Sequence, residues 1–347
     1  MLTRRTLARD NRQEAAELAF LRLHPQHAGN GEENAYSNPP PAGGLNYIAN
    51  YSKGLPHNGV GEVDPAAYRA LLKALASGDD SDSEQIPMGA PLANRRRFVN
   101  PQAGLAFDLE GPDAAAVTIP PAPRIDGPEN SGEMAELYWM ALLRDVNFTN
   151  YGNDPGPNTT TDAATSLTND FSVFRGPRDG AGNVTPDTLF RGSTPGDLIG
   201  PYVSQFLLKP VVFGTLRFNQ RQLTAVGGVD YMMDEPEWRT IQDGAQPAGQ
   251  NQFDTVRRYI RNARDLATYV HFDALYEAYL NACLILLDMG APFDHGNPYT
   301  DSQTQQGFGT FGGPHVLSLV TEVATRALKA VREEGCQAVL NMICKHP

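Results

Sequence analysis

The stretch QFDTVRRYIRNARDLATYVHFDALYEAYLNACLILLD, residues 252–288, decides the fold class because it carries the longest helical pattern in the chain. Its apolar residues recur at intervals of three and four, which gathers them on one face of a helix. Gly290 and Pro292 follow, as is typical after the end of a helix. The pattern predicts one continuous helix from Gln252 to Asp288, and so long a helix indicates a large helical bundle.

Other segments repeat the helical pattern. Asp64 predicts a helix start, because its carboxylate can accept from free backbone N–H groups ahead of a helix over Pro65–Ala76. Asn130 and Glu133 resemble a capping box at the start of a core helix. A further helix is expected over His315–Arg332. Few segments alternate as strands do, so the sequence predicts a mainly α fold, a helical bundle with long Gly/Pro-rich loops.

Composition narrows the class of protein. The net charge is −12, and the basic run Arg95–Arg97 lies in a Pro/Gly-rich loop, which favours a solvated turn over a nucleic-acid site. Met1–Asp10 is charged and does not read as a secretory signal. The longest apolar run, Leu280–Leu287, is too short to span a bilayer. We therefore expect a soluble, cytoplasmic protein with no nucleic-acid and no membrane partner.

Candidate metal ligands are weak in this sequence. Cys336, Cys344 and His346 could be imagined around a metal, but their spacing matches no zinc pattern. Cys283 lies on an apolar segment and is expected in the core. The acidic run Asp79–Glu84 does not have the glycine and terminal glutamate of a calcium loop at the required spacing, so a solvated linker is favoured.

The residues do not form a self-contained active site by spacing alone. Arg144 and Asp145 are more simply explained by ion pairing than by acid–base chemistry. His271 and Asp273 stand two positions apart, so they point to different faces of a helix. His315 begins a helix, where an anion could bind, but a structural role is favoured.

Three long blocks, in the same order, resemble a known family. They are MAELYWMALLRD at Met134–Asp145, GPYVSQFLL at Gly200–Leu208, and FGTFGGPHVLSLVTEVATRALKAVR at Phe308–Arg332. The chain up to Arg332 is similar to the vanadium-dependent bromoperoxidases of algae and cyanobacteria, members of the vanadium haloperoxidase family.

The resemblance implies a helical fold of paired bundles shared with acid phosphatases of the PAP2 type. It implies vanadate as cofactor, attached through one histidine and held by lysine, arginine and serine side chains and a glycine amide. Convergent donors and positive charge are what an oxyanion requires. The implied reaction is oxidation of halide by hydrogen peroxide to hypohalous acid, which halogenates an organic acceptor. A homo-oligomer is also expected.

The similarity breaks off after Arg332, where the chain continues EEGCQAVLNMICKHP. The position of the family's vanadate lysine falls on Gly335, and Lys345 and His346 do not restore the pattern. The later Ser-Gly-His block is missing as well. Arg332 itself matches an arginine that lines the halide pocket in red-algal-type members, so the resemblance implies that role for it.

One further site follows from the resemblance. Asp294 and Asp301 fall where some members hold a structural calcium, although a plain polar loop explains these residues equally well.

The sequence thus predicts three consecutive parts. Residues 1–130 form N-terminal helices and extended loops, residues 131–332 the helical-bundle core, and residues 333–347 an aberrant tail where the vanadate-binding domain should continue. We expect a truncated haloperoxidase that is inactive alone. The alternative is a non-catalytic helical subunit that pairs with a separately encoded C-terminal half or an intact paralogue.

Overall fold

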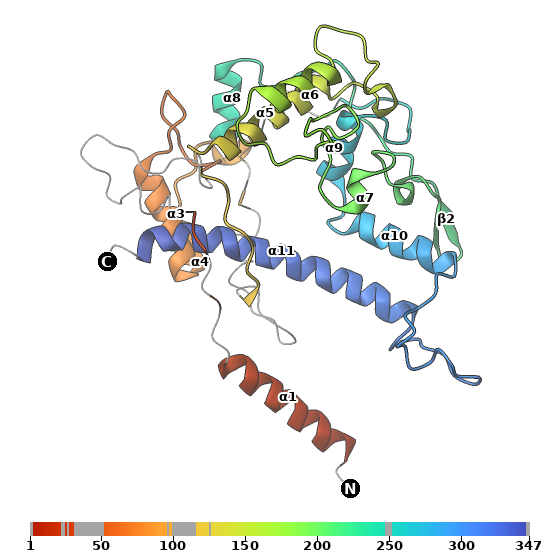
Figure 1. Ribbon diagram of the computed structural model, residues 1–347. Coiled ribbons are helices and arrows are strands. Elements are labelled where there is room, and N and C mark those ends of the chain that lie inside the picture. The colour runs from red at the N-terminus through yellow and green to blue at the C-terminus, as the bar shows by residue number, and fades with distance from the viewer. Residues whose placement is uncertain are drawn as a thin grey trace. The chain divides into compact units, whose positions relative to one another are not determined.

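The computed structural model describes residues 3–21, 25, 28–30, 52–95, 97–98, 116–124, 126–246 and 252–344, and for residues 19 and 333–344 only the backbone. The chain divides into two compact units, each assembled from separate stretches. The first unit comprises residues 1–122, 231–248 and 325–347, and the second comprises residues 123–230 and 249–324. The mainly helical class predicted from the sequence is confirmed (Figure 1).

Besides the part of α11 (Gly313–Cys344) from residue 325 onward, the described residues of the first unit form four α-helices and a 3-10 turn: α1 (Arg4–Leu21), α3 (Pro65–Ser77), α4 (Asp80–Ser83), η1 (Leu92–Asn94) and α8 (Glu235–Gln242). Helix α3 begins where the sequence predicts, because the Asp64 side chain accepts from Ala67 N at 2.8 Å. Gly78, with φ of 64°, ends it in the left-handed conformation. The buried face of α3, with Tyr68 and Leu71, packs on Leu55 and Ile86.

Three glycines bring separate backbone stretches of this unit together. Gly54 N donates to Gln242 O at 2.9 Å, and Gly89 N donates to Gly54 O at 2.9 Å. Gly244 adopts φ of +90°, and a Cβ on it would lie 2.8 Å from Gly54 Cα. Only glycine combines that backbone conformation with so close an approach.

The second unit centres on α5 (Pro128–Leu143) and α6 (Thr160–Asn169), which pack against each other (Figure 1). Their shared core contains Leu143 and Leu167, both buried, with Val184 and Leu189 from the following loop. A capping box between Thr159 and Asp162 starts α6. The unit also contains two short 3-10 turns and a four-residue helix. The turn η4 (Phe148–Asn150) lies between α5 and α6, and α7 (Pro195–Leu198) and η5 (Gln205–Leu207) come after α6.

A two-stranded hairpin gives this unit a second, smaller core. Strand β1 (Val211–Phe213) pairs antiparallel with β2 (Leu216–Phe218). Val211 is fully buried against Leu284 and Ile285 of helix α10 (Glu277–Asp288). The hairpin therefore anchors α10 beside the loop that follows β2.

The predicted continuous helix over Gln252–Asp288 is wrong. The segment contains two helices, α9 (Ala263–Phe272) and α10, bent by 95° to each other. Leu275, in the break, adopts φ of 42°, which no helix tolerates.

The first part of that segment is extended rather than helical. Phe253, Arg258 and Asn262 form single bridges to Ala225, Gln222 and Asn147 respectively. Tertiary partners therefore override the helical spacing of the apolar residues upstream of Asn262.

Smaller differences concern the ends of helices. The capping box expected at Asn130 and Glu133 is wrong, because α5 begins at Pro128 after Gly127 and has no side-chain cap. The stretch Thr161–Phe174 reads as a short helix by its sequence, and the helix there, α6, ends earlier, at Asn169. The apolar stretch Leu105–Phe107 is a candidate short strand by its sequence, and it lies outside the described residues.

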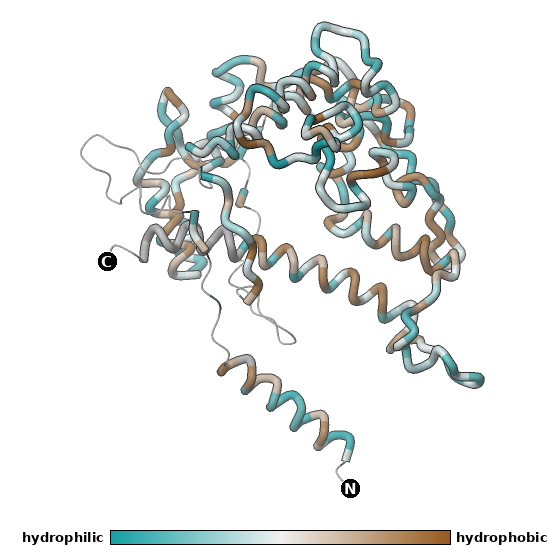
Figure 2. The backbone as a smooth tube through the Cα atoms, viewed as in Figure 1, coloured by the Kyte–Doolittle hydropathy of each residue, from teal (hydrophilic) through white to brown (hydrophobic). Residues whose placement is uncertain are grey.

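Helix α11 (Gly313–Cys344) extends the helix predicted over His315–Arg332 at both ends. Figure 2 shows apolar segments recurring along its described part, and Leu319 and Val323 expose 44% and 62% of their surface. Among the described helices none by itself has the length and apolar composition needed to cross a membrane. The pair α9 and α10 reaches them only when taken together.

The approach of Gly244 to Gly54 generates a prediction. We expect Gly244→Ala to destabilise the protein by about 2 kcal/mol, since the new methyl meets backbone and the φ is unfavourable for alanine. Gly180→Ala is the matched control, because nothing lies within 4 Å of the new Cβ. Urea denaturation followed by circular dichroism measures both. Equal stability of the two variants would contradict the assigned constraint.

Candidate functional site

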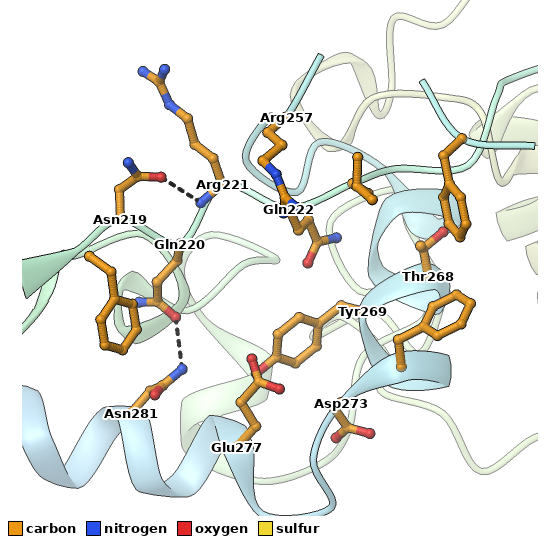
Figure 3. A pocket seen from close by; sticks show the side chains of 14 residues that line it. Asn219, Gln220, Arg221, Gln222, Arg257, Thr268, Tyr269, Asp273, Glu277 and Asn281 are labelled. Carbon is orange, nitrogen blue, oxygen red and sulfur yellow. Dashed lines mark hydrogen bonds between the residues drawn. The ribbon is translucent and has the colours of Figure 1, made fainter. Parts of the chain in front are cut away.

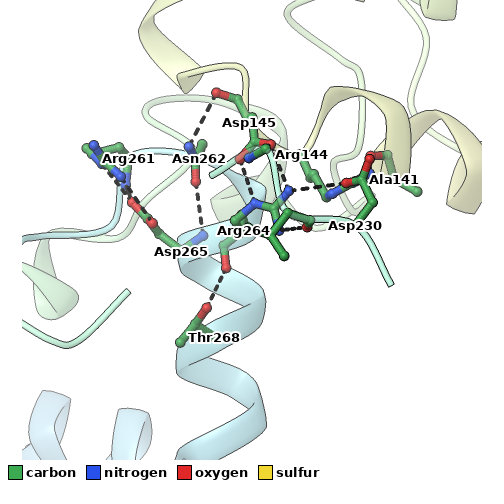
Figure 4. A network of polar contacts seen from close by, with 11 residues as sticks. Ala141, Arg144, Asp145, Asp230, Arg261, Asn262, Arg264, Asp265 and Thr268 are labelled. Carbon is green, nitrogen blue, oxygen red and sulfur yellow. Dashed lines mark hydrogen bonds and ion pairs between the residues drawn. The ribbon is translucent and has the colours of Figure 1, made fainter. Parts of the chain in front are cut away.

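A network of ion pairs joins the residues after α5 to the start of α9 (Figure 4). Its central contact is the bidentate pair between Arg264 and Asp145, with Nε to Oδ1 at 2.6 Å and Nη2 to Oδ2 at 2.8 Å. The Arg264 side chain is 9% exposed and the Asp145 side chain 41%. Two parallel charge-assisted hydrogen bonds of this kind fix both position and orientation.

Backbone groups and a second ion pair complete the surroundings of Arg264. Its Nη1 donates to Val229 O at 2.9 Å, and Gly228 N donates to Asp145 Oδ2 at 3.2 Å. Arg144 pairs with Asp230, which also lies 3.8 Å from Arg264 Nη2. The loop around residues 228–230 is thereby held to the end of α5.

The other half of the network surrounds Asp265, whose side chain is 1% exposed. Its carboxylate accepts from Arg261 Nε at 2.8 Å and from Arg261 N at 3.1 Å. Asn262 accepts from Asp265 N at 3.0 Å and donates from Nδ2 to Asp145 O at 3.3 Å. One asparagine thus caps α9 and connects the two halves of the network.

The backbone places these side chains opposite one another. Arg264 N donates to Arg144 O at 2.9 Å, and Phe148 N donates to Arg261 O at 2.9 Å. The chain segments after α5 and before α9 therefore run together, and their charged side chains meet. A cavity of about 510 Å³ lies beside them, lined also by Asp254.

The charges in this site perturb one another. The hydrogen bonds from Arg264 are the main cause that holds the pKa of Asp145 below its usual value, against the opposing effect of burial. The hydrogen bond to Asp265 raises the pKa of Arg261 further above its ordinary value. Both shifts favour the charged forms, so the network consists of ion pairs at neutral pH.

Charge balance decides what the network can bind. Three arginines, at positions 144, 261 and 264, face three aspartates, at positions 145, 230 and 265. An oxyanion such as vanadate requires convergent donors with an excess of positive charge. The described side chains of this network do not fit vanadate, because each guanidinium is neutralised by a carboxylate. The network therefore acts as a structural clamp, in which the pair of Asp145 and Arg264 holds the segment after α5 to the start of α9.

The residues singled out by the resemblance do not lie in this network. Arg332 is half-buried on α11, and Gly335 lies further along the same helix, where only the backbone is described. The halide-pocket role of Arg332 and the loss of the vanadate lysine at Gly335 stay predictions.

Of the two predicted calcium ligands, Asp294 makes a hydrogen bond within its own loop. The Asp294 carboxylate accepts from Gly296 N at 2.7 Å within its own loop. Asp301 is exposed. Within the described ranges no group of three or more His, Cys, Asp or Glu side chains is arranged to hold a metal ion. Calcium binding at Asp294 and Asp301 stays a prediction.

The remaining candidates behave as structural residues where they can be described. His315 Nδ1 accepts from Phe311 N at 3.0 Å, which bears out the structural role favoured for it. Cys283 is buried, as expected. The side chains of Cys336, Cys344 and His346 lie outside the described residues.

Sequence reasoning anticipated an ion pair for Arg144 and Asp145 but missed their partners. Arg264 stands 119 positions from Asp145 and was assigned to the middle of a continuous helix. The signal that could have located it is Asn262 followed three residues later by Asp265, a capping pattern at a helix start. No local pattern in the sequence connects that start to Asp145.

No family model matches the chain. Among curated proteins, it is 40% identical to a vanadium-dependent bromoperoxidase of Corallina pilulifera over 93% of its own length and 64% of the relative. It is 37% identical to one of Ascophyllum nodosum, over 82% of this chain and 52% of the relative. The chain therefore spans less than two thirds of the length of these relatives.

A solved structure shows the same fold. It is the homohexameric structure of the second vanadate-dependent bromoperoxidase from Ascophyllum nodosum, with a TM-score of 0.80 and 30% identity. The match covers 91% of this chain and 52% of that one. These comparisons confirm the resemblance stated from the three sequence blocks.

The clamp between Asp145 and Arg264 predicts a measurable loss of stability. We expect Asp145→Ala to cost about 2 kcal/mol, because it leaves the buried Arg264 short of charge compensation. The value is below that for fully buried pairs since Asp145 is 41% exposed. Asp126→Ala, which breaks the exposed pair with Arg124, should cost much less, because solvent screens that pair. Equal losses in urea denaturation would show that Asp145 is not a clamp.

Glu136 on α5 provides a pH-dependent test. Burial, and secondarily the charge of Glu133, raises the pKa of Glu136 above its ordinary value. The folded state therefore binds its proton more tightly than the unfolded state, and stability falls as pH rises through the window between the ordinary and the raised pKa. Glu136→Gln should stabilise the protein by about 0.5 kcal/mol at neutral pH, a value reduced for partial solvent screening.

The gain from Glu136→Gln should disappear below about pH 4, where the carboxyl is protonated in both states. Glu14→Gln, on the exposed surface of α1, is the control and should change little at either pH. A gain that persisted in acid would assign the effect to packing rather than to charge.

Proposed function

Because this chain is a homologue of the vanadium-dependent bromoperoxidases, we propose that it acts in peroxide-driven oxidation of halide. The observation that carries this proposal is the 40% identity over 93% of the chain, together with the fold shared at a TM-score of 0.80. In that reaction hydrogen peroxide, halide and a proton give hypohalous acid and water. The hypohalous acid then halogenates an organic acceptor.

The residues of this chain favour a role as a structural scaffold in that activity rather than as the vanadate-binding part. The described arginines around Asp145 are neutralised in pairs and offer no excess positive charge for vanadate. The sequence after Arg332 also carries glycine, Gly335, where the resemblance calls for lysine. We therefore propose that these 347 residues do not turn over halide by themselves. Vanadate-binding groups would be supplied from outside them.

A second candidate is a non-catalytic helical subunit, and the surface of α5 favours it. Met134, Leu137, Tyr138 and Leu142 recur at helical spacing and expose between 43% and 67% of their surface. An apolar stripe of this kind on a surface helix indicates a contact with another protein. Its occupant would be a separately encoded C-terminal half or an intact paralogue. The homohexameric relative supports a homo-oligomer as a further arrangement.

A bromination assay distinguishes a scaffold for halide oxidation from a non-catalytic subunit. The purified chain is incubated with orthovanadate, hydrogen peroxide and bromide, and bromination of a phenol acceptor is followed by absorbance. We expect no turnover above a control without protein. Addition of the C-terminal segment of the Corallina pilulifera relative, which this chain does not match, should produce vanadate-dependent turnover if the chain supplies the scaffold. That segment alone is the matched control.

Turnover by the chain alone at a rate typical of bromoperoxidases would overturn the inactivity proposal and leave the family assignment in place. No turnover with the added segment, while light scattering shows that the two associate, would favour the non-catalytic subunit. A replacement of Leu137 by serine on α5 should weaken that association, and Leu7→Ser on exposed α1 is its control.

A further inference from the structure

A pocket of about 440 Å³ lies in the second unit between the loop after β2 and the helices α9 and α10 (Figure 3). The loop over residues 219–223 forms one wall, and the bend between α9 and α10 forms the other. The volume suits a molecule with one ring and a short substituent. Arg332, Asp294 and Asp301 are not among the residues that line it.

Aromatic side chains cover much of the wall. Phe218, Phe253, Phe272 and Tyr269 all line the pocket. The rings of Phe253 and Phe272 lie 5.5 Å apart at 59°. Such walls accept an apolar ring, and the faces of aromatic rings also attract cations.

Near the bend between α9 and α10, one buried polar group makes no hydrogen bond. The Tyr269 hydroxyl is shielded from solvent and has no hydrogen-bond partner among the described residues. Burial raises the pKa of Tyr269 to about 12, with further contributions from the negative charges of Glu277 and Asp273. A buried hydroxyl without a partner is costly, so a ligand that hydrogen-bonds to it would gain affinity.

Glu277 supplies a negative charge beside that hydroxyl (Figure 3). One of its oxygens, Oε2, accepts from Ala274 N at 3.1 Å, which fixes the carboxylate at the bend. An acceptor-only carboxylate and a phenol oxygen together favour a ligand that donates several hydrogen bonds. A protonated primary amine has three donors and the complementary charge.

Several other polar groups of the pocket are engaged or distant, whereas the Asp273 carboxylate also lines it and adds negative charge near Tyr269. Gln220 donates to Lys209 O at 2.7 Å, and Gln222 donates to Asp265 O at 2.9 Å. The Arg221 guanidinium lies 5.4 Å from the centre of the Tyr259 ring. Figure 3 shows Arg257 at the end of the pocket opposite Glu277. The end at Tyr269 and Glu277 therefore carries negative charge, which favours a cation there.

We propose that this pocket binds a small organic amine, with its ammonium group at Glu277 and Tyr269 and its ring among the phenylalanines. The carboxylate supplies the charge, the phenol oxygen accepts a second hydrogen bond, and Phe253 and Phe272 contact the ring. This inference does not depend on halide oxidation, because it concerns binding alone.

Calorimetric titration of the whole chain with benzylamine, benzyl alcohol and benzoate tests the proposal. Benzylamine should bind most tightly and benzoate most weakly. Glu277→Gln keeps an acceptor for Ala274 N but removes the charge, and should weaken benzylamine about tenfold while benzyl alcohol is unaffected. Tyr269→Phe should weaken benzylamine about threefold through the lost acceptor.

Asp288→Asn is the matched control, because Asp288 lies on the same helix outside the pocket and the substitution removes an equal charge. It should leave the affinity for benzylamine unchanged. The proposal is overturned if benzoate binds as tightly as benzylamine, or if Glu277→Gln and Asp288→Asn have the same effect. Both variants are first compared with the parent chain by circular dichroism, so that a loss of fold is recognised.

Discussion

The pairing of Asp145 with Arg264 is the constraint on which the second unit depends. Asp145 follows α5, and Arg264 lies in the first turn of α9, so the pair fixes the start of one helix against the end of another. Since Arg264 is 9% exposed, its charge requires a partner inside the protein. The position of α9 in turn determines where the bend before α10 falls, and hence where the amine pocket opens.

Neutral charge balance explains why this cluster stabilises rather than catalyses. Each guanidinium has a carboxylate partner, and the hydrogen bonds favour the ionised form of both groups. A catalytic oxyanion site needs the opposite arrangement, with positive charge in excess and donors directed to an empty position. The arginines of this cluster in the second unit are arranged as paired, neutralised groups and not as an oxyanion site.

Local signals predicted the parts of the fold that local physics determines. Asp64 accepts a backbone hydrogen bond at the start of α3, which follows from its position before Pro65. The continuous helix over 252–288 was wrong because its apolar spacing satisfies two helices and an extended segment equally well. The bridges of Phe253 and Arg258 to residues about 30 positions upstream decide between these, and periodicity carries no information on them.

The candidate sites differ in the same way. The family resemblance named Arg332, Gly335, Asp294 and Asp301 by their place in a pattern, and pattern alone does not say what surrounds a side chain. The pocket at Tyr269 and Glu277 could not be predicted, because it exists only where α9 bends into α10. An uninterrupted helix would hold these two residues about 12 Å apart along one axis, so they could not converge on one pocket. The break that sequence periodicity conceals is therefore the feature that creates the pocket.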